Sequence, residues 1–272
     1  MIGTARLSVR LGGSSGRGGT VAPWMDAPPT ALIGARHLTI LIHGFNNDER
    51  AAHSSYEQFI AQSWLTRRPS PKVGTVCEFF WPGDIDAPRS IAAAFYAESV
   101  TRAPHAGRVL AEYLHELSAT GPLEVSLICH SLGNRVALEM AKALVYMRSP
   151  VRISHMCLLA AAVPSMMIYE GGPLHDAVES ISRTLVLHSE ADEALGIVFR
   201  GGQWLAAEDA SHAVGKYGAP LRRWTVSSDM KPYKHGHYWP GVRSAGKVHE
   251  FLGLSNVRSL ETRSTPYREV GS

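Results

Sequence analysis

Cysteine is scarce in this chain of 272 residues, and no apolar segment is long enough to cross a membrane. Cys77, Cys129 and Cys157 are odd in number and each lies inside an apolar run, which indicates buried free thiols. Free thiols suit a reducing compartment, so we expect a cytoplasmic protein.

The longest apolar stretch, Met156 to Ile168, is interrupted by Pro164 and is shorter than the roughly 20 residues that span a bilayer. Stable membrane insertion is therefore not expected.

The sequence also lacks an excess of one charge and a recognisable targeting signal. Lys and Arg number 27 against 24 Asp and Glu, a net charge of +3, and no basic stripe is interleaved with aromatic residues. This pattern gives no reason to expect a nucleic-acid partner.

The first residues hold no apolar stretch of signal-peptide length, and the last residues hold no lipidation motif. Hydrophobic residues make up 45% of the chain, which excludes a disordered protein.

Compact apolar runs separated by helical patterns fill most of the chain after residue 36. Each run is rich in Val, Ile, Leu or Phe, as expected for strands that are covered on both faces. The runs are residues 37–45, 75–83, 123–131, 153–164, 183–190 and 222–228. Helical patterns lie over residues 48–65, 90–117 (with an interruption at Pro104) and 132–147. This alternation predicts an α/β fold with a mostly parallel central sheet and helices on both faces.

The N-terminal region has a different pattern. Residues 5–11 alternate and predict a strand at an antiparallel edge of the sheet, and the glycine-rich residues 12–19 predict a hairpin or loop. No linker divides the chain, so we expect one domain over residues 1–272. Its expected parts are an N-terminal strand and loop region (1–36), a core (37–252) and a C-terminal tail (253–272).

The segment ICHSLGNRVAL, residues 128–138, places a serine between an apolar strand and an amphipathic helix. A serine on such a tight turn projects from the carboxyl edge of the sheet, and small neighbours such as Gly133 let the strained turn pack closely. The N-terminus of the following helix favours developing negative charge. Ser131 is therefore a candidate nucleophile. The alternative is that Ser131 is only the N-cap of the helix that begins near Leu132.

A second motif, ILIHGFNND at residues 40–48, ends the first central strand. The backbone amide after Gly44, that of Phe45, is expected to face the serine turn and to form half of an oxyanion hole. The amide of Leu132 is expected to form the other half. The alternative is an ordinary turn in which an asparagine of the motif caps the next helix, and the two interpretations use different atoms.

Together these motifs resemble those of the α/β-hydrolase fold family. HGFN and CHSLGN are similar to its oxyanion and nucleophile motifs, and EFFWPG (78–83) is similar to a poorly characterised bacterial subgroup of esterase- or lipase-like serine hydrolases. The resemblance covers about residues 37–240 and implies an α/β-hydrolase fold with a small cap or none. Cys129 is a departure, because the nucleophile motif usually has glycine there. Its small side chain is expected to be tolerated as a packing residue.

The resemblance also implies the chain order serine, acid, histidine. The acid is expected after a later core strand, where RTLVLHSEADEALG offers Asp192, with Glu190 and then Glu193 as alternatives. A buried carboxylate there would hold the tautomer of the histidine and stabilise its charged form. Alternatively, Asp192 only caps a helix that begins near Glu193.

The histidine is expected after the last strand, where the sequence contains both His235 and His237. His235 fits the family's order of histidine, small residue, any residue and aromatic residue, here completed by Gly236, His237 and Tyr238. His237 is the alternative base. An H-x-H pair also binds metals, but no cysteine or carboxylate cluster accompanies this one, so neither a metal nor another cofactor is expected.

These residues predict a serine hydrolase, of carboxylesterase or lipase type, that cleaves small-molecule acyl esters through Ser131, His235, Asp192 and an acyl-enzyme. The alternatives are a thioesterase or amidase with the same triad, and a non-catalytic ligand-binding or interaction protein of the same fold. The residues expected to line the substrate pocket are His43, Gly44, His130, Met166 and Met167. The sequence does not predict an oligomeric state.

Overall fold

The computed structural model describes residues 4–254 except for 12–18, 26–29, 64, 67–69, 85–95, 197–198, 200, 202, 204–205, 207–210 and 220–224. Its centre is a seven-stranded sheet in the order β1-β5-β4-β6-β7-β8-β9, in which all neighbouring strands are parallel. The strands are β1 (Ala5–Ser8), β4 (His37–Ile42), β5 (Thr75–Phe80), β6 (Glu124–His130), β7 (Arg152–Leu159), β8 (Arg183–His188) and β9 (Thr225–Asp229). The prediction of a mostly parallel α/β sheet is confirmed.

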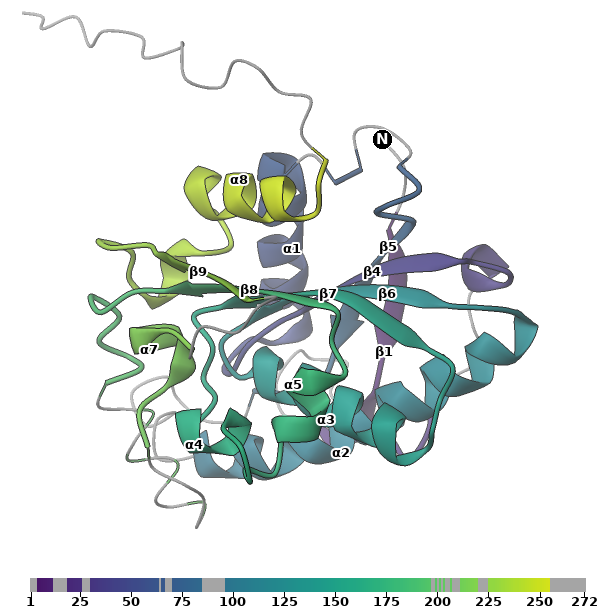
Figure 1. The fold of residues 1–272 in the computed structure, drawn as a ribbon, viewed down its shortest axis with the longest axis horizontal. Coiled ribbons are helices and arrows are strands. Elements are labelled where there is room, and N and C mark those ends of the chain that lie inside the picture. The colour runs from purple at the N-terminus through teal and green to yellow at the C-terminus, as the bar shows by residue number, and fades with distance from the viewer. Residues whose placement is uncertain are drawn as a thin grey trace, which may run out of the picture.

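Helices cover both faces of this sheet (Figure 1). On one face lie α1 (Glu49–Ser63) and α8 (Val242–Phe251), and on the other lie α2 (Tyr96–Leu117), α3 (Gly133–Tyr146) and α5 (His175–Glu179). The shorter helices are α4 (Ser165–Ile168), α7 (Val214–Tyr217), η1 (Thr30–Leu32), η3 (Ser118–Thr120) and η4 (His235–His237). Within the described ranges, no helix combines the length and hydropathy needed to cross a membrane.

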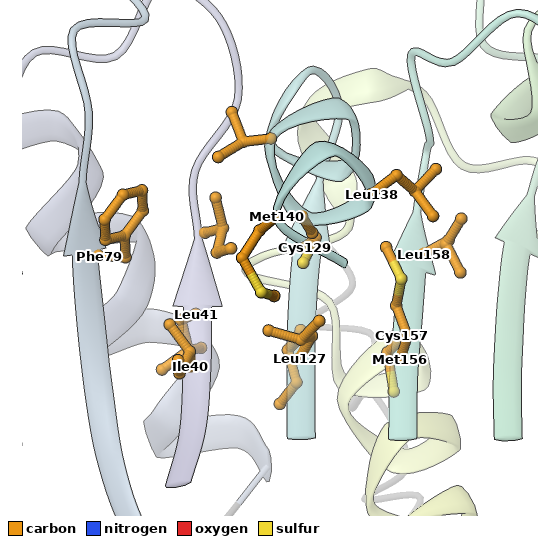
Figure 2. Packing of buried hydrophobic residues seen from close by; sticks show 14 of the residues in the cluster. Ile40, Leu41, Phe79, Leu127, Cys129, Leu138, Met140, Met156, Cys157 and Leu158 are labelled. Atoms are coloured by element: carbon orange, nitrogen blue, oxygen red, sulfur yellow. The ribbon is translucent and has the colours of Figure 1, made fainter. Parts of the chain in front are cut away.

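The central strands are buried on both faces, which explains why their sequences are continuous apolar runs. In β6, Leu127 and Cys129 point to the same side because side chains alternate along a strand. Figure 2 shows both side chains close to Met140 of α3. Cys129 is fully buried, and burial raises the pKa of its thiol well above the usual range. Cys129 therefore acts as a small packing residue beneath α3.

The N-terminal strand differs from its predicted direction. β1 pairs with β5 in parallel, and does not form an antiparallel edge. The direction of an edge strand depends on the path of its connection, which a hydrophobic pattern does not encode. The flanks of the glycine-rich run, β2 (Arg10–Leu11) and β3 (Thr20–Val21), pair antiparallel as the expected hairpin, although residues 12–18 lie outside the described residues. Most of the expected tail, residues 255–272, lies outside them too.

The predicted interruption at Pro104 is also absent, because α2 continues through this residue. A proline inside a helix removes one backbone hydrogen bond and costs about 3 kcal/mol. The helix buries a long stripe, which includes Val100, Ala103 and Gly107, and α2 packs along α3. Tertiary packing of this stripe offsets the local penalty, as it commonly does for helices in proteins.

Candidate active site

Ser131 occupies the turn between β6 and α3, at the carboxyl edge of the sheet. Its φ of 53° lies in the left-handed region, which is strained for any residue other than glycine. The Ser131 amide donates to the Leu159 carbonyl (3.0 Å), and the Ser131 carbonyl accepts from the Ala162 amide (3.1 Å). These bonds tie the strained turn to β7 and the residues after it. No side chain caps α3, so the Ser131 hydroxyl does not act as its N-cap.

Two glycines permit the close approach on which this turn depends. A Cβ at Gly44 would lie 2.7 Å from the Ser131 Cβ, and a Cβ at Gly133 would lie 2.4 Å from the His43 carbonyl oxygen. Neither position has room for a side chain, so both require glycine. The loop after β4 is thereby placed directly against the serine.

The structure brings Ser131, His235 and Asp192 into one hydrogen-bonded chain. The Ser131 Oγ lies 2.8 Å from the His235 Nε2, and the His235 Nδ1 lies 2.8 Å from the Asp192 Oδ2. Because a carboxylate only accepts, the Nδ1 carries the proton and the Nε2 accepts from the serine hydroxyl. Asp192 is fully buried, whereas 28% of the His235 side chain is exposed. The other Asp192 oxygen accepts a hydrogen bond from the Leu195 amide (3.2 Å), but residues 193–196 form a turn and not the start of the expected helix.

The alternative acid and base residues lie elsewhere. The His237 Nδ1 accepts from the Lys234 amide at 3.2 Å, within its own turn. Glu190 and Glu193 are exposed, and the Glu190 carboxylate faces a lysine ammonium group at 3.5 Å. The geometry therefore singles out His235 and Asp192 as the partners of the serine.

The two amides of the oxyanion prediction belong to Phe45, which follows Gly44 in the loop after β4, and to Leu132, which follows Ser131 at the start of α3. Leu132 precedes the first turn of α3, where amides have no carbonyl of the preceding turn to bond. The loop at Phe45 is held by Asn47, whose Nδ2 donates to the Gly44 (3.3 Å) and Phe45 (3.0 Å) carbonyls. Neither amide bonds another residue that the structure describes. Their role stays a prediction.

His43 supports the Gly44 loop instead of lining a substrate pocket. Its ring is fully buried, its Nδ1 donates to the Gly44 carbonyl (2.9 Å), and its Nε2 accepts from the Trp81 amide (3.3 Å). The Trp81 indole donates back to the His43 carbonyl (2.8 Å), and the two rings stack with centroids 5.7 Å apart. Burial lowers the pKa of His43 to about 4, so the ring is neutral. We therefore assign His43 to the framework of the loop.

Met166, Met167 and His130, which were also expected to line the pocket, have different surroundings. Met166 is exposed on α4, whereas Met167 is buried with its Sδ 2.8 Å from the Arg135 Nη1. No described contact joins either methionine to Ser131, so their pocket role stays a prediction. His130 is buried and contacts the backbone of His235. Across the described ranges, no group of three or more His, Cys, Asp or Glu residues is arranged to hold a metal ion.

Three residues that hold the site were not found from the sequence. The Tyr56 hydroxyl donates to a β5 carbonyl (2.6 Å) and accepts from the His43 amide (2.7 Å). Arg10 and Asp84 form a buried ion pair (2.5 Å), and Arg10 also donates to the Trp81 carbonyl (3.1 Å). The W-P-G motif marked this loop, but nothing in the pattern pairs residues that lie 74 positions apart.

Comparison with known proteins gives one family match. A family model described as "Alpha/beta hydrolase of unknown function (DUF900)" matches residues 32–210. No curated protein matches the sequence.

Several solved structures resemble the chain in part. The product of gene lin2722 from Listeria innocua is 10% identical, with 84% of this chain and 97% of that chain covered and a TM-score of 0.47. Esterase PE8 is 17% identical (82% and 94% covered, TM-score 0.43). The Bacillus licheniformis lipase BlEst2 is 15% identical (84% and 94% covered, TM-score 0.40).

Proposed function

The chain belongs to the alpha/beta hydrolase family described as of unknown function (DUF900), and we propose that it is a serine hydrolase that cleaves carboxylic esters. The observation that carries the proposal is the hydrogen-bonded chain from the Ser131 Oγ through His235 to the buried Asp192, with both contacts at 2.8 Å. A nucleophile, a base in contact with it and a third group that orients the base form the arrangement needed for covalent catalysis.

In the proposed mechanism, the Ser131 oxygen attacks the ester carbonyl while the His235 Nε2 takes the hydroxyl proton. Asp192 accepts from the Nδ1 and stabilises the imidazolium ion that forms. The imidazolium then returns its proton to the leaving alcohol, which departs and leaves an acyl group on Ser131. A water molecule, deprotonated by the same Nε2, attacks the acyl-enzyme. The bond between the acyl carbon and the Ser131 oxygen breaks, the Nε2 returns the proton to that oxygen, and the acid is released.

The negative charge of the tetrahedral intermediate is proposed to be stabilised by the amides of Phe45 and Leu132. The N-terminus of α3 begins at the serine turn and favours an anion there. The buried framework of His43 and Trp81 fixes the loop that carries Phe45. Donors that are fixed in advance need no reorganisation when the charge develops, which is the physical basis of such stabilisation.

A panel of p-nitrophenyl acyl esters, with a matched thioester and anilide, tests this proposal by kcat/KM. We expect the purified protein to hydrolyse the esters faster than the thioester or the anilide. The Ser131→Ala variant should lose roughly 10⁴-fold or more in kcat. Equal rates for the wild-type and Ser131→Ala proteins would contradict the proposal, and so would a preference for the anilide.

A further inference from the structure

His130 lies at the last position of β6, immediately before the serine, and its side chain is buried beside the ring of His235. Only 6% of the residue is exposed. Its ring centroid lies 5.0 Å from that of His235, 6.1 Å from that of Tyr238 and 5.7 Å from that of Trp239. The ring thus fills the space between the nucleophile strand and the loop that carries His235.

One nitrogen of this ring bonds that loop directly. The His130 Nε2 lies 2.9 Å from the backbone carbonyl oxygen of His235. A carbonyl only accepts, so the Nε2 carries the proton and a neutral ring leaves the Nδ1 bare. The Nδ1 is buried and has no hydrogen-bond partner among the residues that the structure describes. Although an unsatisfied buried nitrogen lowers stability, the ring is bonded, within the described ranges, on its Nε2 side alone, toward the loop that carries His235.

We propose that His130 is a positioning residue, whose hydrogen bond to the His235 carbonyl sets the distance between the Ser131 Oγ and the His235 Nε2. This inference rests on the proposed function. The nucleophile and the base come from segments 104 residues apart in the sequence, and the His235 side chain is partly exposed. The bond links the backbone of the base to the strand that ends at the nucleophile. An error of about 1 Å in such a distance lowers rates by about 100-fold.

The electrostatic surroundings keep His130 in the donor form that this role requires. Burial lowers its pKa to about 3, and the neighbouring His235 acts in the same direction. The hydrogen bond to the His235 carbonyl and the charge of Asp192 raise this pKa, and His43 lowers it, but burial is the largest effect. His130 therefore stays neutral while His235 takes and returns a proton, and the two rings do not compete for it.

Three substitutions separate positioning from packing. The Nε2 of glutamine is as many bonds from the Cα as the Nε2 of histidine, so His130→Gln can still donate to the His235 carbonyl. His130→Asn has a donor that ends one bond short, and His130→Met fills the space without a donor. The readouts are the second-order rate of fluorophosphonate labelling at Ser131 and the low-field NMR signal of the His235 Nδ1 proton. Thermal unfolding identifies any variant that does not fold.

We expect His130→Gln to be labelled within about threefold of the wild-type rate. His130→Asn and His130→Met, where folded, should be labelled roughly 10- to 100-fold more slowly and should lose or broaden the NMR signal. Folded Asn or Met variants labelled at the wild-type rate would overturn the inference, as would a Gln variant as slow as they are. If the wild-type protein is not labelled, the proposed function fails. The NMR signal then decides the positioning role by itself, since an unchanged signal in the Asn and Met variants refutes it.

Discussion

Ser131 is held in a backbone conformation that any side chain disfavours. Its φ of 53° is stabilised by hydrogen bonds to the neighbouring strand and by the close contact with Gly44. The left-handed region costs roughly 1–2 kcal/mol for a residue with a Cβ. The fold therefore stores strain at the residue to which we assign the chemistry.

This strain predicts a difference between two inactive variants. Ser131→Gly and Ser131→Ala both lose the hydroxyl, but only glycine adopts the positive φ without strain. We expect Ser131→Gly to have a free energy of unfolding about 1 kcal/mol higher than that of Ser131→Ala. Urea denaturation measures both. An alanine variant as stable as the glycine variant would show that the turn is not strained.

Replacing each of the two neighbouring histidines by alanine should affect the kcat of ester hydrolysis very differently. His235→Ala removes the group that contacts the serine hydroxyl, so kcat should fall roughly 10⁴-fold. His237→Ala removes a bond within one turn, so the loss should remain within about tenfold. The kcat values of the two purified variants show which histidine acts as the base. A large loss in His237→Ala with an active His235→Ala would exchange the roles of the two residues.

The sequence predicted the members of the site better than their contacts. The order of Ser131, Asp192 and His235 is the order that the family resemblance implies, and the three residues follow β6, β8 and β9. The choice between His235 and His237 needs coordinates, because the two residues lie in one short helical turn and their directions depend on its backbone. The prediction that His43 lines the substrate pocket was wrong for a similar reason. A pattern shows that a histidine ends a strand, but it does not show that both ring nitrogens are already bonded.

The approach of α3 to β4 depends on the absence of a side chain at Gly133. An added Cβ would lie 2.4 Å and 2.6 Å from the backbone oxygens of His43 and Ile42, which cannot move without shifting the strand. We expect Gly133→Ala to lower the free energy of unfolding by about 3 kcal/mol, as overpacking in a core does. Gly246 in α8 is the matched control, because an added Cβ there meets nothing within 4 Å.

The Gly246→Ala control should raise the free energy of unfolding, because alanine is more favourable than glycine inside a helix by about 0.8–1 kcal/mol. Urea midpoints of the wild type, Gly133→Ala and Gly246→Ala test both predictions. A Gly133→Ala variant as stable as the wild type would mean that α3 does not approach β4 this closely.

Among the secondary-structure elements, the core strands and the main helices were predictable, because burial on both faces leaves continuous apolar runs. The direction of β1 was not predictable, because the same alternating pattern fits a parallel or an antiparallel strand. The path of the connecting chain determines which of the two forms. The continuation of α2 through Pro104 was not predictable either. Local propensity favours an interruption there, and the packing of α2 against α3 overrides it.

For the molecule as a whole, the buried histidines predict a loss of stability in acid. The pKa of His43 is about 4 in the folded protein and about 6.5 in an unfolded chain. Between these pH values the unfolded state binds more protons, so the free energy of unfolding falls as the pH falls from about 6.5 to about 4. The contribution of His43 at pH 7 is on the order of 3 kcal/mol.

A comparison of the wild type with His43→Gln isolates this contribution, because His130 titrates in both proteins. Urea denaturation at pH 7.5 and pH 4.5 should show a smaller acid-dependent loss in the variant, by about 2 kcal/mol. The same loss in both proteins would mean that His43 is not held neutral by burial.

If Ser131 is a nucleophile activated by His235 and Asp192, a fluorophosphonate forms a covalent bond to it. The protein is treated with a fluorophosphonate and digested, and the modified peptide is located by mass spectrometry. We expect one adduct, on Ser131, which is absent from Ser131→Ala and forms at least 100-fold more slowly in His235→Ala. An unlabelled wild-type protein, or equal labelling of Ser131→Ala, would contradict this role of Ser131.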